Sequence, residues 1–366
     1  MRRDDCHSSM QRENPLVSTG TGVGMSVGVG VLGSGFMGRT WANVAQRSAG
    51  SHLVAVAGGR RAPALAQDLG CTLHEDLAAL LADPAVDLVI LTTPPAGHGD
   101  QAAAAAAAGK HMLIEKPMAN TVSECERIDL ACRAADVRCA VVSQHRFRAA
   151  PLAAKAVVDS GEIGRVTMVR ALGPEVGFWD TEKTQDQWKL DPAQQTAYAS
   201  WGAHACDLIR WFVGDEPDLA FAVFGQYHPQ PPPARSAMVT YGFRGGAMAQ
   251  VWMSYDIPEP GLGGGLQMLI VGTDGMIDLN SYGTVKVGTA AGWRDEFIQP
   301  PFDPSDPVDP IRLGAYRAEL EDLLAAVASG GEPGVNAREG VATTAMLEAA
   351  EQSAQSRQAV PISISG

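Results

Sequence analysis

Positive charge is scarce in this sequence. It has 28 Lys and Arg residues against 41 Asp and Glu residues, for a formal net charge of -13. That balance disfavours general affinity for nucleic-acid phosphates or anionic lipid. No apolar run reaches the roughly 20 residues of a membrane helix, and none follows the N-terminal arginines as in a signal peptide. We therefore expect a cytoplasmic protein that binds neither nucleic acid nor membrane.

Clustered cysteines are also missing. The six cysteines, at positions 6, 71, 125, 132, 139 and 206, form no Cys-x-x-Cys pair. Zinc sites need closer clusters, and the histidines show no metal spacing either. We expect reduced, apolar thiols and no metal.

The 366 residues, 46% of them hydrophobic, are enough for two domains. Residues 1–25 read as a flexible tail, with Met25 as an alternative start. From 26 to 147, short apolar strands alternate with helices, among them one built on seven alanines that stops at Gly109. This alternation predicts a Rossmann domain, a doubly wound parallel sheet covered on both faces.

Residues 148–366 follow a different pattern. A helix over 149–160 and another from Trp201 to Val213 precede strands joined by short turns such as FRGGA and GTDGM. Glycines in such turns indicate hairpins. We expect an α+β domain with a mostly antiparallel open sheet and helices on one side.

A glycine motif follows the first strand of the Rossmann domain. Gly33, Gly35 and Gly38 form G-S-G-F-M-G between the strand VGVGVL and a helix. In that context the first glycine permits the turn, the second leaves room for a pyrophosphate, and the third lets the helix approach the sheet. Free N–H groups at the helix start, around Phe36 and Met37, bind the phosphates. The motif predicts a nicotinamide dinucleotide site.

The end of the second strand bears on which dinucleotide binds. An NAD enzyme normally has Asp or Glu there to bind the ribose 2′-hydroxyl. This chain has Gly58, Gly59, Arg60 and Arg61, and no acid before Asp68. Guanidinium groups suit a 2′-phosphate, so NADP is favoured, with NAD as the alternative.

Glu115-Lys116-Pro117 ends a strand at the carboxyl edge of the parallel sheet, where such folds bind ligands. A lysine at this place can polarise a carbinol or carbonyl oxygen beside the nicotinamide.

Five segments occur in the order GSGFMG, TTPPAGH (92–98), EKP (115–117), QHRF (144–147) and WGAHACDLIRWFVGDEP (201–217). In this combination the chain resembles the Gfo/Idh/MocA oxidoreductases, which include glucose–fructose oxidoreductase and inositol dehydrogenase. The likeness extends from Val27 nearly to the C-terminus. It implies hydride transfer between NAD(P) and a hydroxyl or keto carbon of a sugar, cyclitol or related polyol.

The resemblance also implies site residues. Lys116 is the expected catalytic lysine, and His204 lies beside the substrate hydroxyl. Many family members have Asp four residues before this histidine, where this chain has Ser200. Ser200, His204 and Asp207 share one helix face, so we expect His204 to act with Lys116 or Asp207. The expected cofactor-binding residues are Gly33, Gly35, Phe36, Met37, Gly38, Gly58, Arg60, Arg61, Thr93, Pro94, His98, Glu115, Lys116 and Gln144.

Alternatives stay open. Within the same family, the chain is alternatively a glycosidase that uses NAD for transient oxidation, or a dinucleotide-sensing regulator without catalysis. A polar, aromatic loop over 179–198 suits a polyol site, but Gln194-Gln195 stands where relatives often have glycines. The open sheet of such domains commonly joins subunits, so we expect a homodimer or homotetramer.

Overall fold

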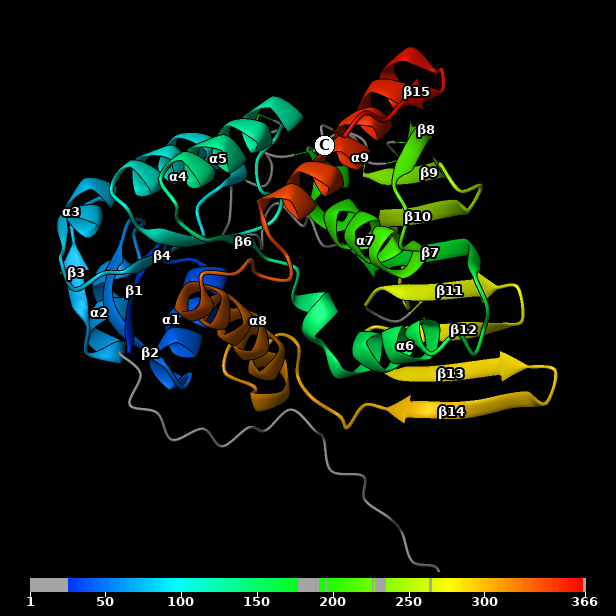
Figure 1. Ribbon diagram of the computed structural model, residues 1–366, viewed down its shortest axis with the longest axis horizontal. Helices are drawn as coiled ribbons and strands as arrows, with labels where there is room; N and C mark the ends of the chain where they lie inside the picture. Colours follow the sequence, from blue (N-terminus) through cyan, green and yellow to red (C-terminus); the bar gives the residue numbers. More distant parts are fainter. Residues whose placement is uncertain are drawn as a thin grey trace, which may run out of the picture.

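The computed structural model describes residues 26–176, 188, 191, 193–194, 196–225, 227, 235–262 and 265–364. The tail expected over 1–25, with Met25, and most of the loop over 179–198, with Gln195, lie outside the described residues. Two sheets lie side by side, each with its own helices (Figure 1).

The first sheet is fully parallel and has the strand order β3-β2-β1-β4-β5-β6. Its strands are β1 Val27–Leu32, β2 Ser51–Ala57, β3 Thr72–His74, β4 Leu88–Leu91, β5 His111–Ile114 and β6 Cys139–Val141. Its helices are α1 Phe36–Arg47, α2 Ala62–Leu69, α3 Leu77–Ala82, α4 His98–Ala107 and α5 Val122–Ala134. Separate apolar clusters form against its two faces, which confirms the predicted doubly wound Rossmann sheet.

The second sheet has the order β14-β13-β12-β11-β7-β10-β9-β8-β15. Only the pairing of β10 with β7 is parallel among the described strand pairs. Its strands are β7 Val166–Val176, β8 Pro217–Gly225, β9 Ser236–Phe243, β10 Met248–Ile257, β11 Gln267–Gly272, β12 Gly275–Asn280, β13 Thr284–Thr289, β14 Gly292–Ile298 and β15 Val360–Pro361.

Three helices contact the second sheet: α6 Ala149–Asp159, α7 Ala197–Val213 and α9 Ala337–Ser356. The mostly antiparallel α+β architecture is thereby confirmed. Strand β14 was not predicted, because nearly all of its side chains are exposed and it lacks an alternating apolar pattern.

One helix does not follow the expected division at 147/148. Helix α8, Pro310–Ser329, lies beside α1 of the Rossmann domain (Figure 1). Its Leu320 and Leu323 are fully buried in the cluster that holds Trp41. The late part of the chain therefore returns to cover one face of the first sheet. Nothing within the sequence of α8 reveals which of the two sheets the helix covers.

Among the described helices, none has both the length and the apolar character needed to cross a membrane.

Candidate functional site

The three motif glycines meet three different surroundings. Gly33 has φ +112°, and a Cβ there would lie 2.3 Å from Thr92 Oγ1. A Cβ on Gly38 would lie 2.2 Å from the carbonyl oxygen of Gly33, so helix α1 touches the turn directly. A Cβ on Gly35 would meet nothing within 4 Å. The open space at Gly35 is what a pyrophosphate needs, and the other two glycines hold the backbone that surrounds it.

Helix α1 begins without a capping side chain, because its N-cap residue is Gly35. The first N–H groups of a helix have no partner within the helix, and they carry its positive dipole end. Phe36 and Met37 therefore offer the expected phosphate-binding backbone.

The turn after β2 lies against this glycine loop. The Arg61 N–H donates to Ser34 Oγ at 3.2 Å, and a Cβ on Gly59 would lie 2.4 Å from the same oxygen. Gly58 and Gly59 both have positive φ, of 74° and 82°. Arg60 and Arg61 are exposed at the place where the adenosine ribose lies in Rossmann folds.

Lys116 follows β5 and reaches the second domain. Its Nζ donates a hydrogen bond of 2.8 Å to the backbone carbonyl of Ser200 in the first turn of α7. Glu115 is buried and accepts from Trp41 Nε1 at 2.8 Å. Burial raises the pKa of Glu115, while nearby Lys116 partly opposes that rise. Glu115 thus anchors the end of the strand to α1, and the ammonium group of Lys116 points toward α7.

His98 is fully buried at the start of α4, just after Thr93 and Pro94. Its Nε2 lies 2.8 Å from the Thr93 carbonyl, and its Nδ1 lies 3.2 Å from the carbonyls of both Pro117 and Met118. The ring therefore ties the loop after β4 to the loop that carries Lys116. The contact of Pro94 and His98 with the nicotinamide stays a prediction.

Gln144 lies in the 3₁₀ turn η2, Gln144–Phe147, which follows β6. Its side-chain oxygen Oε1 is buried and has no hydrogen-bond partner. Such an atom normally finds a partner, because leaving it without one costs about 1–3 kcal/mol. Together with the open space at Gly35, this free acceptor fits a bound dinucleotide at the carboxyl edge of the first sheet.

Helix α7 begins earlier than the predicted Trp201. Thr196 caps it by accepting the Ala199 N–H at 3.1 Å, so Ser200 lies within the first turn. One turn later, His204 is only 8% exposed, and its ring packs edge-on against Trp201 and His145. Burial holds the pKa of His204 well below its usual value, with Lys116 adding to the effect. The ring is therefore neutral at physiological pH and can accept a proton.

Lys116, His204 and Asp207 line one cavity of about 20 Å³. The three side chains therefore meet at one place, although the cavity holds little more than one water molecule.

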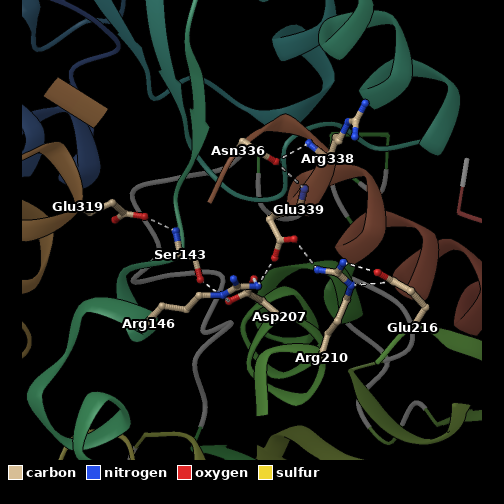
Figure 2. A network of polar contacts seen from close by, with 9 residues as sticks. All are labelled: Ser143, Arg146, Asp207, Arg210, Glu216, Glu319, Asn336, Arg338 and Glu339. Atoms are coloured by element: carbon tan, nitrogen blue, oxygen red, sulfur yellow. Dashed lines mark hydrogen bonds and ion pairs between the residues drawn. The ribbon is translucent and has the colours of Figure 1, made fainter. Parts of the chain in front are cut away.

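The partners of Asp207 differ from those expected. Its carboxylate accepts hydrogen bonds from Arg146 Nε at 3.0 Å, from Arg146 Nη2 at 2.7 Å and from the Ser143 hydroxyl. Arg146 in turn contacts Glu339 at 2.6 Å, and Arg210 joins Glu339 at 2.7 Å (Figure 2).

No hydrogen bond joins Asp207 to His204 among the residues that the structure describes. Of the two partners expected for His204, Lys116 or Asp207, the carboxylate of Asp207 is instead bound to Arg146 and Ser143. The carboxylate joins α7 to η2, and α9 joins them through the contacts of Glu339 with Arg146 and Arg210. The sequence spacing put His204 and Asp207 on one helix face, but it did not reveal that Arg146 binds the Asp207 carboxylate.

Three further residues near His204 were not predicted as site residues: His145, Arg146 and Arg148. The motif QHRF was noted for its order along the chain and not for its chemistry. Arg146 binds Asp207. His145 packs against the rings of His204 and Tyr282, and Arg148 lies over the ring of Tyr282.

Family models match both halves of the chain. Residues 27–143 match the oxidoreductase family described as having an NAD-binding Rossmann fold, and residues 152–278 match the GFO/IDH/MocA C-terminal domain. The chain belongs to the Gfo/Idh/MocA family. It is therefore an oxidoreductase with an NAD-binding Rossmann fold, which confirms the family and the fold that the sequence motifs predicted.

Several relatives match along most of their length. The chain is 28% identical to inositol 2-dehydrogenase 2 of Saccharopolyspora erythraea, covering 93% of this chain and 96% of the relative. It is 28% identical to D-xylose 1-dehydrogenase (NADP(+)) 2 of Haloferax volcanii, over 82% and 89% of the two chains. Among solved structures, an oxidoreductase domain protein from Kribbella flavida aligns with a TM-score of 0.81 at 26% identity, over 93% of this chain and all of that one.

Proposed function

We propose that this protein is an NADP-preferring dehydrogenase or reductase that acts on a CH–OH or keto carbon of a sugar, cyclitol or related polyol. The contact between Lys116 Nζ and the Ser200 carbonyl carries the proposal, because it brings the strand-end lysine to the helix that presents His204. Relatives named as inositol and xylose dehydrogenases support this substrate class.

The bound dinucleotide would accept or give the hydride at its nicotinamide ring. The chain's own residues bind and orient the reactants and move the proton. Lys116 donates a hydrogen bond to the substrate oxygen and stabilises negative charge that develops there. His204, neutral because of its lowered pKa, accepts the hydroxyl proton in the oxidation direction. Proton transfer of this kind contributes about 10²–10⁴-fold in rate.

The preference for NADP rests on Arg60 and Arg61. They are exposed on a turn that touches the glycine loop through Ser34, and Asp68, the first acid after this strand, forms an ion pair with Arg39 at 2.7 Å. Two guanidinium groups can bind a 2′-phosphate with charge-assisted hydrogen bonds. Titration with NADP and NAD, each oxidised and reduced, tests this preference.

The decisive experiment combines nucleotide binding with turnover. Purified protein is titrated with each nucleotide and then assayed at 340 nm with sugars, cyclitols and their keto forms. We expect saturable binding, and Lys116→Met should lower the rate by at least about 100-fold without abolishing binding. Lys110→Met is the matched control, because that lysine lies at the other end of β5 and bonds the backbone carbonyls of Asp83 and Val86.

Two results would contradict the proposal. Absence of saturable binding of any pyridine nucleotide removes the cofactor assignment. Equal rates for wild type and Lys116→Met remove the catalytic assignment. Cleavage of a glycoside without net change in NAD(P)H would favour the glycosidase, and tight binding without any turnover would favour the regulator.

We also propose a homodimer or homotetramer formed through the outer face of the second sheet; a cytoplasmic location stays a prediction from the sequence. Large apolar side chains are exposed across neighbouring strands of that sheet, and contiguous apolar surface of this kind marks interaction sites. The exposed residues include Met168, Phe221, Val223, Met238 and Met248.

Val223 and Met238 are cross-strand neighbours on β8 and β9, 60% and 55% exposed. Light scattering should give the mass of at least a dimer, and Val223→Lys with Met238→Lys should shift it to the monomer. Leu130→Lys, on a 61% exposed residue of α5, is the control. A wild-type monomer would refute the interface.

A further inference from the structure

Beside His204 lies a second imidazole that the proposed proton transfer does not use. His145, in η2, is only 1% exposed. Its ring centre lies 4.7 Å from that of His204 and 5.3 Å from that of Tyr282, edge-on in both contacts. The ring of His145 is therefore part of the same site and packs directly against His204.

Both ring nitrogens of His145 are buried without a hydrogen-bond partner. Burial, helped by Arg148 and Lys116, holds the pKa of His145 well below its usual value. A neutral imidazole offers one donor and one acceptor, and leaving either group buried without a partner destabilises the fold. A buried ring with two free nitrogens next to a reaction centre is suited to hydrogen-bond a ligand.

Arg148 shares the ring of Tyr282 with His145. Its guanidinium carbon lies 4.0 Å from the Tyr282 centroid and 5.6 Å from that of Phe302. The residue is 5% exposed, and its Nε has no hydrogen-bond partner. A cation–π contact offsets only part of the free energy that desolvating a charge costs. An anion is the group that such a cation normally binds.

Two carboxylates of this region are already bound to another arginine. Asp207 and Glu339 hold Arg146, and no carboxylate forms an ion pair with Arg148 in the part of the chain that the structure describes. The charged groups that lower the pKa of His204 and His145 are Lys116 and Arg148, both cationic. These two cations therefore face both histidines of the site.

We propose that His145 and Arg148 form a subsite for a carboxylate on the substrate, so that the substrate is an acidic sugar such as a uronate or aldonate. The inference rests on the proposed function, which it narrows from polyols in general to sugar acids. The Nε–H of Arg148 donates a charge-assisted hydrogen bond to one carboxylate oxygen, and the N–H of the neutral His145 donates to the other. The reacting carbinol of the same molecule lies at Lys116 and His204.

Matched pairs of sugars test this subsite. D-glucuronate is compared with D-glucose, and D-galacturonate with D-galactose, because each pair differs only in a carboxylate replacing a hydroxymethyl group. A site built to hydrogen-bond a group rejects the analogue without it by 10⁴–10⁵-fold in favourable cases. We expect kcat/KM to be at least about 100-fold higher for the acid. An equal or higher value for the neutral sugar overturns the proposal.

Two variants separate binding from a purely structural role. Arg148→Met keeps much of the apolar stem and should raise KM for the acid far more than for the neutral sugar, removing the preference, while Arg148→Lys should restore part of it. Equal losses on both members of a pair, together with a lower Tm, would mean that Arg148 only supports Tyr282 and Phe302.

A binding measurement on wild-type protein needs neither turnover nor a variant. Calorimetry of the NADP complex should give a lower Kd for D-glucuronate than for D-glucose, and Kd for the acid should rise with added salt. Equal affinities would refute the subsite. Loss of nucleotide binding would instead refute the proposed function, so the two failures are distinguishable.

Discussion

Asp207→Ala should destabilise this protein through a buried ion pair. The substitution removes the acceptor of three hydrogen bonds, two from Arg146 and one from Ser143. The side chain of Arg146 is 8% exposed, and among the residues with described positions it would keep Glu339 alone as a charged partner. Breaking a buried pair by removing one member costs about 3–5 kcal/mol. Because Glu339 remains, we expect the lower end, about 3 kcal/mol.

That free energy converts into a shift in Tm. At about 2.1 cal/mol/K per residue, a chain of 366 residues has an unfolding entropy near 0.8 kcal/mol/K. A loss of about 3 kcal/mol then lowers Tm by about 4 °C, measured by scanning calorimetry. The control is Asp68→Ala, because Asp68 pairs with Arg39 at an exposed position and such pairs contribute about 0–1 kcal/mol. Shifts of equal size in the two variants would refute the assignment of a buried structural pair.

Two further predictions concern the glycine loop and a buried acid. Gly35→Ala should leave Tm unchanged, since its Cβ meets open space, yet weaken nucleotide binding by at least about tenfold. Gly38→Ala should lower both Tm and the affinity for the nucleotide, because its Cβ meets the carbonyl oxygen of Gly33. Isothermal titration measures binding and scanning calorimetry measures Tm for both variants. Unaltered nucleotide binding in Gly35→Ala would contradict the assignment of a pyrophosphate to the open space at Gly35.

Burial raises the pKa of Glu319 well above its usual value, so the folded state favours the neutral acid. Stability from this group is present below about pH 4.5 and is lost as pH rises toward the raised pKa. Glu319→Gln should therefore raise Tm at pH 8 more than at pH 5. An effect of equal size at both pH values would exclude this linkage.

The Rossmann elements were readable because their signals are local. Helix α1 follows directly from the glycine turn, and the buried parallel strands are continuous apolar runs. Lys116 was predicted because it ends such a strand, and strand ends of a parallel sheet meet at one edge. Strand β3, with only three residues and Leu73 46% exposed, carried no such signal.

Residues that interact across long separations could not be assigned in this way. The spacing of His204 and Asp207 correctly put them on one helix, but Arg146, 61 residues away from Asp207, decides what the carboxylate does. Likewise, nothing local indicates that His145 and Arg148 lie on the same tyrosine ring.

By itself, the sequence determined the dinucleotide fold, the family and the lysine at the strand end, since each depends on a short motif or on periodicity within one element. Only the tertiary structure decided that α8 returns to cover the first sheet and that Asp207 binds Arg146. It also decided that two buried groups beside His204 have unpaired nitrogens. The physical reason is that burial and charge pairing arise between elements that are distant along the chain, whereas turns and strand periodicity are encoded within a few residues.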